Sequence, residues 1–272
     1  MPDQRERAST LDLEFAQLTD LGRVRTNNED YLGHIAPQTP AQARSHGWLF
    51  VLADGVGGGR QGEVASQTAV ETVTAGFAKS PATETLGSVL TRLVKDANTR
   101  VHETGIAAGS VGAGMSTTIV ACAIRHDRVH VAHVGDSRCY LIRRHAIKSL
   151  TRDHTIANEQ LRIGVVSTTG SANRHALSRS LGSELFVSVE VNDFALQPGD
   201  SLLLCSDGLH GAVPDGKIAS TVAAAPDLTA AAANLISLAN ELSGGDNVSV
   251  QLIRIRSVER MGVYRGRPYK LK

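Results

Sequence analysis

The sequence predicts a single mixed α/β domain built mainly on antiparallel β-sheet, and two observations support this fold class. Four short apolar or alternating runs follow one another within residues 116–150. The gaps between them are about four residues at most, and gaps that short permit only antiparallel neighbours. Longer segments with helical periodicity stand before and after these runs. The 272-residue length fits one large domain or two small ones, and no repeat or low-complexity block divides it.

The first half of the chain contains one clear predicted strand and two predicted helices. The strand is the continuous apolar run Trp48–Ala53, WLFVLA. After a glycine-rich turn, a helix is expected to place one face toward the core, formed by Val64, Thr68, Ala69, Val73 and Phe77. A second helix has the spacing of a buried stripe, formed by Leu86, Val89, Leu90, Leu93, Ala97 and Val101.

The second half is predicted to be richer in strands. The four runs at 116–150 read STTIVACAI, RVHVAHV, RCYLI and IKSL. Alternating valines indicate a strand at 187–191, and a Pro-Gly turn separates it from the apolar strand Ser201–Cys205. The last strand is expected at Val248–Ile255, and the basic tail 258–272 is expected to be poorly ordered. A helix precedes that strand and is marked by Leu228, Ala231, Ala232, Leu235, Ala239 and Leu242.

Composition argues against several classes of protein. Lysine and arginine together number 28 and aspartate and glutamate 27, whereas a dedicated binder of nucleic acid or anionic membranes usually carries a basic excess. No apolar run approaches the roughly 18 residues that a membrane-spanning helix needs. The three cysteines, Cys122, Cys139 and Cys205, form no C-x-x-C pair, which favours a reducing, cytoplasmic compartment. The charged first residues lack the apolar stretch of a secretory signal.

Four aspartates stand at the ends of predicted strands. Asp54, Asp136 and Asp207 each follow an apolar run, and Asp246 precedes one. Two carboxylates about 4 Å apart at an effective dielectric of about 20 repel by roughly 4 kcal/mol, so four acids converge only where cations neutralise them. All-oxygen ligation suits hard ions such as Mg²⁺ or Mn²⁺. Alternatively, each aspartate merely caps a turn or helix start; the sequence alone does not show that the acids meet.

Eight segments resemble, in the same order, the motifs of the metal-dependent protein phosphatase 2C family in its bacterial form. The shared order over most of the chain carries the resemblance, because any single segment is a weak signal. The segments are RTNNED (25–30), DGVGGGRQGEVAS (54–66), GMSTTIV (114–120), VGDSRCYLI (134–142), LTRDHT (150–155), LSRSLG (177–182), LLLCSDGL (202–209) and GGDNVSV (244–250).

The resemblance implies an α+β fold, a four-layer α-β-β-α sandwich with two central antiparallel β-sheets flanked by helices and a metal cluster at one end. It implies one catalytic domain over residues 1–257, followed by the basic tail 258–272. Residues 153–179, which include Asp153, His154 and His175, correspond to the family's flap beside the active site. Many bacterial members have a proline in the flap, and its absence here leaves substrate preference open.

The resemblance also implies two to three Mn²⁺ or Mg²⁺ ions per chain. Asp54 would bridge two of them, with the backbone carbonyl of Gly55 on one, and Asp136 would hold the third. The other implied ligands are Asp207 and Asp246, which complete the second metal's shell, and Glu29 and Asp30, which act through bound water.

These ligands imply a hydrolytic mechanism. A water that bridges two divalent cations loses a proton near neutral pH, and the resulting hydroxide attacks phosphorus in line without a covalent enzyme intermediate. The guanidinium of Arg25 is suited to hold two phosphate oxygens; the alternative is a surface salt bridge to its neighbours Glu29 and Asp30. Eukaryotic relatives have a histidine as proposed proton donor where this chain has Val56, which leaves the source of the leaving-group proton open.

The function implied is a serine/threonine protein phosphatase that acts on phosphorylated proteins and opposes a bacterial Ser/Thr kinase. One alternative is a pseudophosphatase or phosphoprotein-binding module, and another is hydrolysis of small-molecule phosphates. Retention of Asp54, Asp136, Asp207 and Asp246 favours the active enzyme, because a pseudoenzyme usually loses at least one metal ligand.

Two other patterns are rejected on the sequence. Gly57, Gly59 and Gly62 satisfy G-x-G-x-x-G, but the acid at the preceding strand end would face a pyrophosphate with like charge. Cys122 and Arg128 have the C-x5-R spacing of cysteine-dependent phosphatases. The residues between them indicate a hairpin rather than a phosphate cradle, so Cys122 is predicted to lie in the core.

Four histidines have no role in this account. His130 and His133 flank the VGDSR motif and are interpreted as structural residues rather than transition-metal ligands. His154 and His175 bracket the flap, where a role in handling substrate or product is possible and no feature of the sequence supports one.

Overall fold

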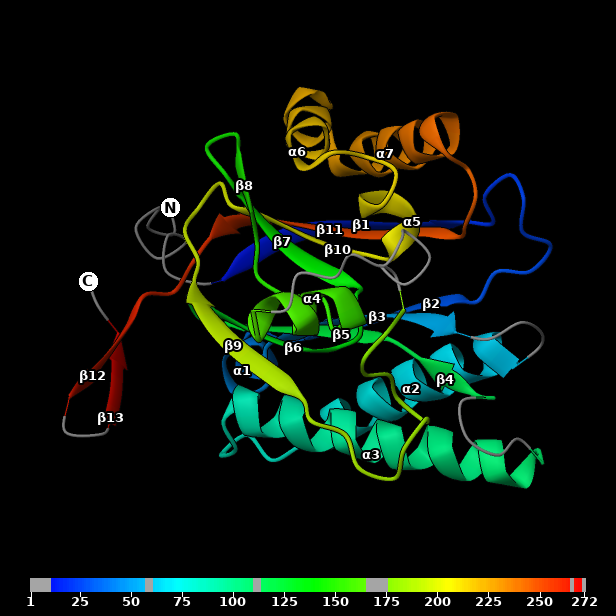
Figure 1. The fold of residues 1–272 in the computed structure, drawn as a ribbon. Helices are drawn as coiled ribbons and strands as arrows, with labels where there is room; N and C mark the ends of the chain where they lie inside the picture. Colours follow the sequence, from blue (N-terminus) through cyan, green and yellow to red (C-terminus); the bar gives the residue numbers. More distant parts are fainter. Residues whose placement is uncertain (1–10, 57–60, 110–113, 165–175, 265–266, 271–272) are drawn as a thin grey trace.

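Two antiparallel sheets lie face to face between two layers of helices, as predicted (Figure 1). The computed structural model describes residues 11–56, 61–109, 114–164, 176–264 and 267–270. One sheet has the order β2-β3-β5-β6-β9, with β4 paired to β3, and the other has the order β1-β11-β10-β7-β8. The strands of the first sheet are β2 (Asp30–Ile35), β3 (Trp48–Val56), β4 (Ser116–Thr117), β5 (Ile119–Arg125), β6 (Arg128–Val134) and β9 (Glu190–Ala195). Those of the second are β1 (Asp12–Asp20), β7 (Arg138–Arg143), β8 (Ala146–Ser149), β10 (Ser201–Cys205) and β11 (Val248–Ser257).

The helices cover the outer faces of the two sheets. Helices α2 (Gln61–Ala78) and α3 (Leu86–Ala107) pack on the first sheet, whereas α5 (Asp207–His210), α6 (Asp215–Ala224) and α7 (Leu228–Leu242) pack on the second (Figure 1). The short helices α1 (Pro40–Ser45) and α4 (Ile156–Arg162) stand outside these layers. Three apolar cores fill the spaces between the four layers.

Strand β3 shows why the run WLFVLA is apolar throughout. Leu49 and Val51 belong to the core beneath α2 and α3, whereas Phe50 and Leu52 belong to the core between the sheets. Because successive side chains of a strand point to opposite faces, a central strand covered on both sides needs apolar residues at every position.

The helical faces were predicted well for α3 and α7 and partly wrongly for α2. All six residues of the predicted α3 stripe are buried. In α2, however, Val64 is exposed, Thr68 is only half-buried, and the buried face includes Gly62 and Ala65. The six residues that marked α7 are buried except Leu242, which is exposed. Val64 lies in the first turn of α2 and Leu242 in the last turn of α7. At helix ends the spacing of apolar residues does not predict which face of the helix packs on the sheet.

Two segments differ from expectation. Strand β9 begins at Glu190, and Val187 and Val189 precede it while packing against the core beneath α2 and α3. Within the basic tail the sequence predicted no strands. Strands β12 (Met261–Tyr264) and β13 (Arg267–Lys270) form an antiparallel hairpin that projects from one side of the sandwich (Figure 1).

Candidate metal centre

The acids at the strand ends meet at one end of the sandwich, around a cavity of about 500 Å³. The lining includes every predicted metal or phosphate-binding residue except Asp30. Asp30 lies beside the cavity, buried, and directly opposite Asp54 in the β2–β3 ladder. The residues that line the cavity are Arg25, Glu29, Asp54, Gly55, Val56, Ser116, Thr118, Asp136, Ala176, Leu177, Ser180, Asp207 and Asp246.

The end of β3 is held by the segment that contributes β4. The carbonyl of Asp54 accepts hydrogen bonds from the Thr118 amide and the Thr117 hydroxyl, both at 2.8 Å. The Asp54 amide in turn donates to Thr118 Oγ1 at 3.1 Å. The backbone of Asp54 is therefore fixed on both sides, which leaves its carboxylate as the group aimed at the cavity.

Two glycines allow helix α2 to approach the cavity. A Cβ atom on Gly55 would lie 2.2 Å from the carbonyl oxygen of Gly62, and one on Gly62 would lie 2.7 Å from Glu29 Oε1. A larger residue at position 55 would push α2 away from the end of β3, and one at position 62 would displace the carboxylate of Glu29. Close backbone packing is thus a physical reason for glycine at these positions, besides the predicted use of the Gly55 carbonyl as a ligand.

The electrostatics of the cavity show an excess of negative charge. Burial, followed by repulsion from Asp30, Asp207 and other acids, raises the pKa of Asp54 well above its ordinary value. Burial and neighbouring acids also raise the pKa of Asp30 and of Asp136 to about 7. The pKa of Glu29 is raised, mainly by burial. The Arg25 guanidinium at the cavity does not offset this burial and mutual repulsion.

The donor set fits hard divalent cations. Carboxylate oxygens dominate the polar lining of the cavity, and Oδ1 of Asp30 is buried without a hydrogen bond from any described residue. Oxygen-only ligation is what Mg²⁺ and Mn²⁺ prefer, and two such ions would neutralise four carboxylates. The residues present therefore fit the metals that the sequence implied.

Arg25 reaches the cavity from the segment between β1 and β2. Its Nη2 donates to Asp246 Oδ2 at 2.8 Å, and its side chain is 45% exposed. The sequence suggested Glu29 and Asp30 as its partners, but the hydrogen-bonded acid is Asp246, far along the chain. The exposed guanidinium keeps donors available for a phosphate.

Two polar residues that the sequence analysis missed hold the acids in place. Ser206 Oγ donates to Asp30 Oδ2 at 2.8 Å and accepts from the Ser249 amide at 3.0 Å. Asn247 Oδ1 accepts from the Glu29 amide at 2.9 Å, while its Nδ2 donates to two carbonyls of the segment before β2. Each stands next to a predicted metal acid, and this adjacency was the available signal.

The predicted flap residues lie at different places. Asp153 forms a bidentate ion pair with Arg138, with N–O distances of 2.8 and 2.7 Å. His154 is buried behind the loop that carries Asp136. His175 lies outside the described residues. The flap returns to the cavity through Ala176, Leu177 and Ser180.

The rejected patterns can be compared with the structure. Cys122 is buried between the sheets, as predicted, and Arg128 pairs with Asp193. Gly62 lies inside α2; Gly57 and Gly59 lie outside the described residues.

None of the described helices is long and apolar enough to cross a membrane.

Comparison with known proteins agrees with the fold and with the acidic cavity. Residues 23–241 match the family protein phosphatase 2C, and the chain belongs to that family. Among its relatives, the "Serine/threonine phosphatase stp" of Listeria monocytogenes serovar 1/2a is 35% identical over 86% of this chain and 93% of its own length.

Solved structures of two bacterial phosphatases are similar throughout. The catalytic domain of the serine/threonine phosphatase PstP in complex with two manganese ions has a TM-score of 0.77 at 31% identity, covering 91% of this chain and all of that one. Stp1 from Staphylococcus aureus has a TM-score of 0.81 at 29% identity, covering 92% and 97%.

Proposed function

We propose that this protein is a metal-dependent serine/threonine protein phosphatase that hydrolyses phosphoserine and phosphothreonine on proteins. The observation that carries the proposal is the convergence of Asp54, Asp136, Asp207 and Asp246 on one cavity beside Arg25. Relatives named as serine/threonine phosphatases, and a similar phosphatase structure that contains two manganese ions, support it.

The residues of the cavity divide into two tasks. Asp54, the Gly55 carbonyl, Asp207 and Asp246 would hold two Mn²⁺ or Mg²⁺ ions, with Glu29 and Asp30 acting through water, and Asp136 would hold a third. When bound, the ions supply an activated water and neutralise the charge that develops on the phosphoryl group.

Arg25 would bind the phosphate of the substrate. Its guanidinium lies at the cavity and is half exposed, so it can direct two N–H groups at phosphate oxygens while Asp246 orients it. Val56 lines the cavity where eukaryotic relatives have a histidine, and no histidine is among the described lining residues. The leaving serine or threonine alkoxide therefore does not take its proton from an imidazole at position 56.

The wider role remains a proposal as well. The substrate class implies a Ser/Thr kinase as the opposing enzyme, and a cytoplasmic location and a catalytic domain ending near residue 257 stay predictions from the sequence. The binding-module alternative is less well supported, because the metal acids are all present and all but Asp30 line one cavity.

The test is hydrolysis of matched phosphothreonine and phosphotyrosine peptides with Mn²⁺, with Mg²⁺ and with EDTA. We expect metal-dependent release from phosphothreonine, abolished by EDTA and by Asp207→Ala. The control is Asp96→Asn, which removes an exposed acid of α3 outside the cavity and should leave the rate unchanged. Absence of turnover by the wild-type protein with either metal would overturn the proposal in favour of a binding module.

A further inference from the structure

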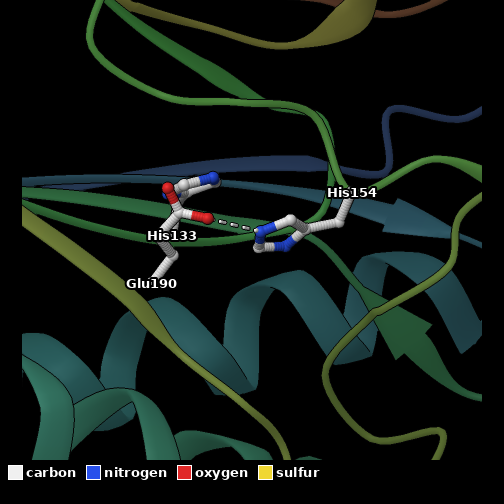
Figure 2. A group of neighbouring side chains, drawn as sticks. All are labelled: His133, His154 and Glu190. Carbon is white, nitrogen blue, oxygen red and sulfur yellow. Dashed lines mark hydrogen bonds and ion pairs between the residues drawn. The ribbon is translucent and has the colours of Figure 1, made fainter. Parts of the chain in front are cut away.

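Three side chains gather behind the loop that carries Asp136: His133 from β6, His154 from the start of the flap, and Glu190 from the start of β9 (Figure 2). Both histidines are fully buried, and their rings stack with centroids 4.6 Å apart and planes 19° from parallel. Figure 2 shows the Glu190 carboxylate directed at His154, with 3.4 Å between Oε2 and Nε2.

This cluster resembles a metal site by composition, since one ligand atom from each residue can lie within 4.8 Å of the others. Its geometry opposes that function. An ion lies in the plane of each imidazole that ligates it, so two rings stacked nearly parallel cannot direct their lone pairs at one ion. In addition, the Arg179 guanidinium lies 3.3 Å from His154 Nε2 and would repel a cation there.

The contacts of His154 instead converge on Gly135, the residue before Asp136. The Gly135 amide donates to His154 Nδ1 at 3.2 Å, and the His154 amide donates to the Gly135 carbonyl at 3.0 Å. We assign the ring proton to Nε2, because Nδ1 then accepts from Gly135 while Nε2 donates to Glu190. With this tautomer Arg179 Nη1, 3.3 Å from Nε2, is a close contact and not a hydrogen bond, and the guanidinium donates to Glu159 instead. One residue thus holds both polar groups of Gly135.

Gly135 itself has little freedom to adapt. Its φ is +103°, and a Cβ atom would lie 2.7 Å from the Thr118 side chain. On the other side of the turn, His210 Nε2 donates to the Asp136 carbonyl at 3.0 Å. The backbone of the Asp136 loop is therefore fixed by hydrogen bonds on both sides of the acid, from the buried His154 and the half-buried His210.

His154 also contacts the return of the flap. Its carbonyl accepts from the Ser178 amide at 2.8 Å, next to Leu177, which lines the cavity. Arg179 joins the same unit through Glu159 of α4, at 2.6 Å. Burial, followed by the effect of His133 and Arg179, lowers the pKa of His154 to about 4, so the imidazole stays neutral and Nδ1 remains an acceptor near neutral pH.

We propose that His154 is a positioning residue that holds the Asp136 loop and the return of the flap in one arrangement, and thereby sets the affinity of Asp136 for its metal ion. The proposal deepens the phosphatase function proposed above and rests on it. Partners that orient a ligand from behind typically contribute 10- to 100-fold to metal affinity or activity.

Two substitutions separate the hydrogen bond from the volume of the ring. His154→Phe keeps a ring that can stack on His133 but removes the acceptor for the Gly135 amide. His154→Asn loses the ring but places an oxygen near the position of Nδ1, so it should restore part of the function. His130→Phe is the matched control, because it replaces a ring on the same strand as His133, and His130 lies near Gly87 of α3 rather than at the Asp136 loop.

The readouts are Mn²⁺ binding followed by electron paramagnetic resonance, exchange of the Gly135 amide followed by NMR, and kcat and KM for a phosphothreonine peptide. For His154→Phe we expect the Mn²⁺ site at Asp136 to lose about 10- to 100-fold in affinity, the Gly135 amide to exchange faster, and kcat to fall. The Mn²⁺ sites at Asp54 should be unchanged, and His154→Asn should recover part of the affinity that His154→Phe loses.

Unchanged Mn²⁺ affinity and unchanged Gly135 exchange in His154→Phe would overturn the proposal, as would equal loss in the Phe and Asn variants. Neither binding nor exchange requires turnover. An inactive wild-type protein that still shows the Phe-specific changes would therefore count against the phosphatase function and support the positioning role of His154.

Discussion

The metal-free protein should become more stable when Asp136 is replaced by Asn. Burial, together with repulsion from Asp207 and Asp153, raises the pKa of the Asp136 carboxyl from 3.8 to about 7. The folded protein therefore binds this proton more tightly than the unfolded chain does. The folded protein consequently loses stability as the pH rises from the pKa of Asp136 in the unfolded chain to its pKa in the folded protein.

The size of the effect follows from the shift. One pKa unit corresponds to 1.36 kcal/mol, so ionisation of Asp136 lowers the free energy of unfolding by about 2 kcal/mol at pH 5 and about 4 kcal/mol at pH 8. Asn cannot ionise and avoids this penalty. Asp136→Asn should therefore stabilise the metal-free protein, more at pH 8 than at pH 5.

The assay is urea unfolding in EDTA at both pH values, with the exposed acid variant Asp96→Asn as control. With Mn²⁺ at a hundredfold excess over the dissociation constant of the Asp136 site, the wild-type protein should gain about 2.7 kcal/mol that the variant lacks. This gain should reverse the order of stabilities at pH 5 and reduce the advantage of the variant at pH 8. A stability change that is the same at pH 5 and pH 8, or a destabilised variant in EDTA at pH 8, would refute the reasoning.

Three further predictions concern single residues. Asp54→Asn should reduce Mn²⁺-dependent hydrolysis of a phosphothreonine peptide by at least about 100-fold, because the carboxylate serves to bind metal. The circular dichroism spectrum should be unchanged, and a rate near that of the wild type would contradict the prediction. Arg25→Ala should raise KM about 10- to 100-fold, as expected for the loss of a charged hydrogen bond to phosphate, and an unchanged KM would remove Arg25 from phosphate binding. Arg138→Ala should lower the free energy of unfolding by about 3 kcal/mol, because it leaves the largely buried Asp153 unpaired. An unchanged free energy of unfolding in urea would disprove this.

The sequence predicted the layers because burial on both faces leaves a clear pattern. The run WLFVLA had to be a covered strand, and the α3 stripe is buried as its spacing indicated. The acids converge because the strands that precede or follow them meet the same end of the sandwich, a consequence of sheet topology. Order along the chain and the family resemblance supplied that topology; periodicity alone did not.

What the sequence missed depends on contacts between distant segments. Arg25 pairs with Asp246, 221 residues away, rather than with its neighbours. Asn247 fixes the Glu29 backbone over a similar separation, and no local pattern reports such a pair. His154 was placed in the flap, but its contacts with Gly135 appear only when the flap and the VGDSR loop are packed together.

The central claim is that the converging carboxylates hold divalent cations. The most direct measurement is anomalous diffraction from crystals of the protein grown with Mn²⁺. The account predicts manganese peaks in the cavity, two of them about 2.0–2.6 Å from oxygens of Asp54 and its neighbours and a third at Asp136. A peak among His133, His154 and Glu190 with none in the cavity, or no peak at all, would contradict it.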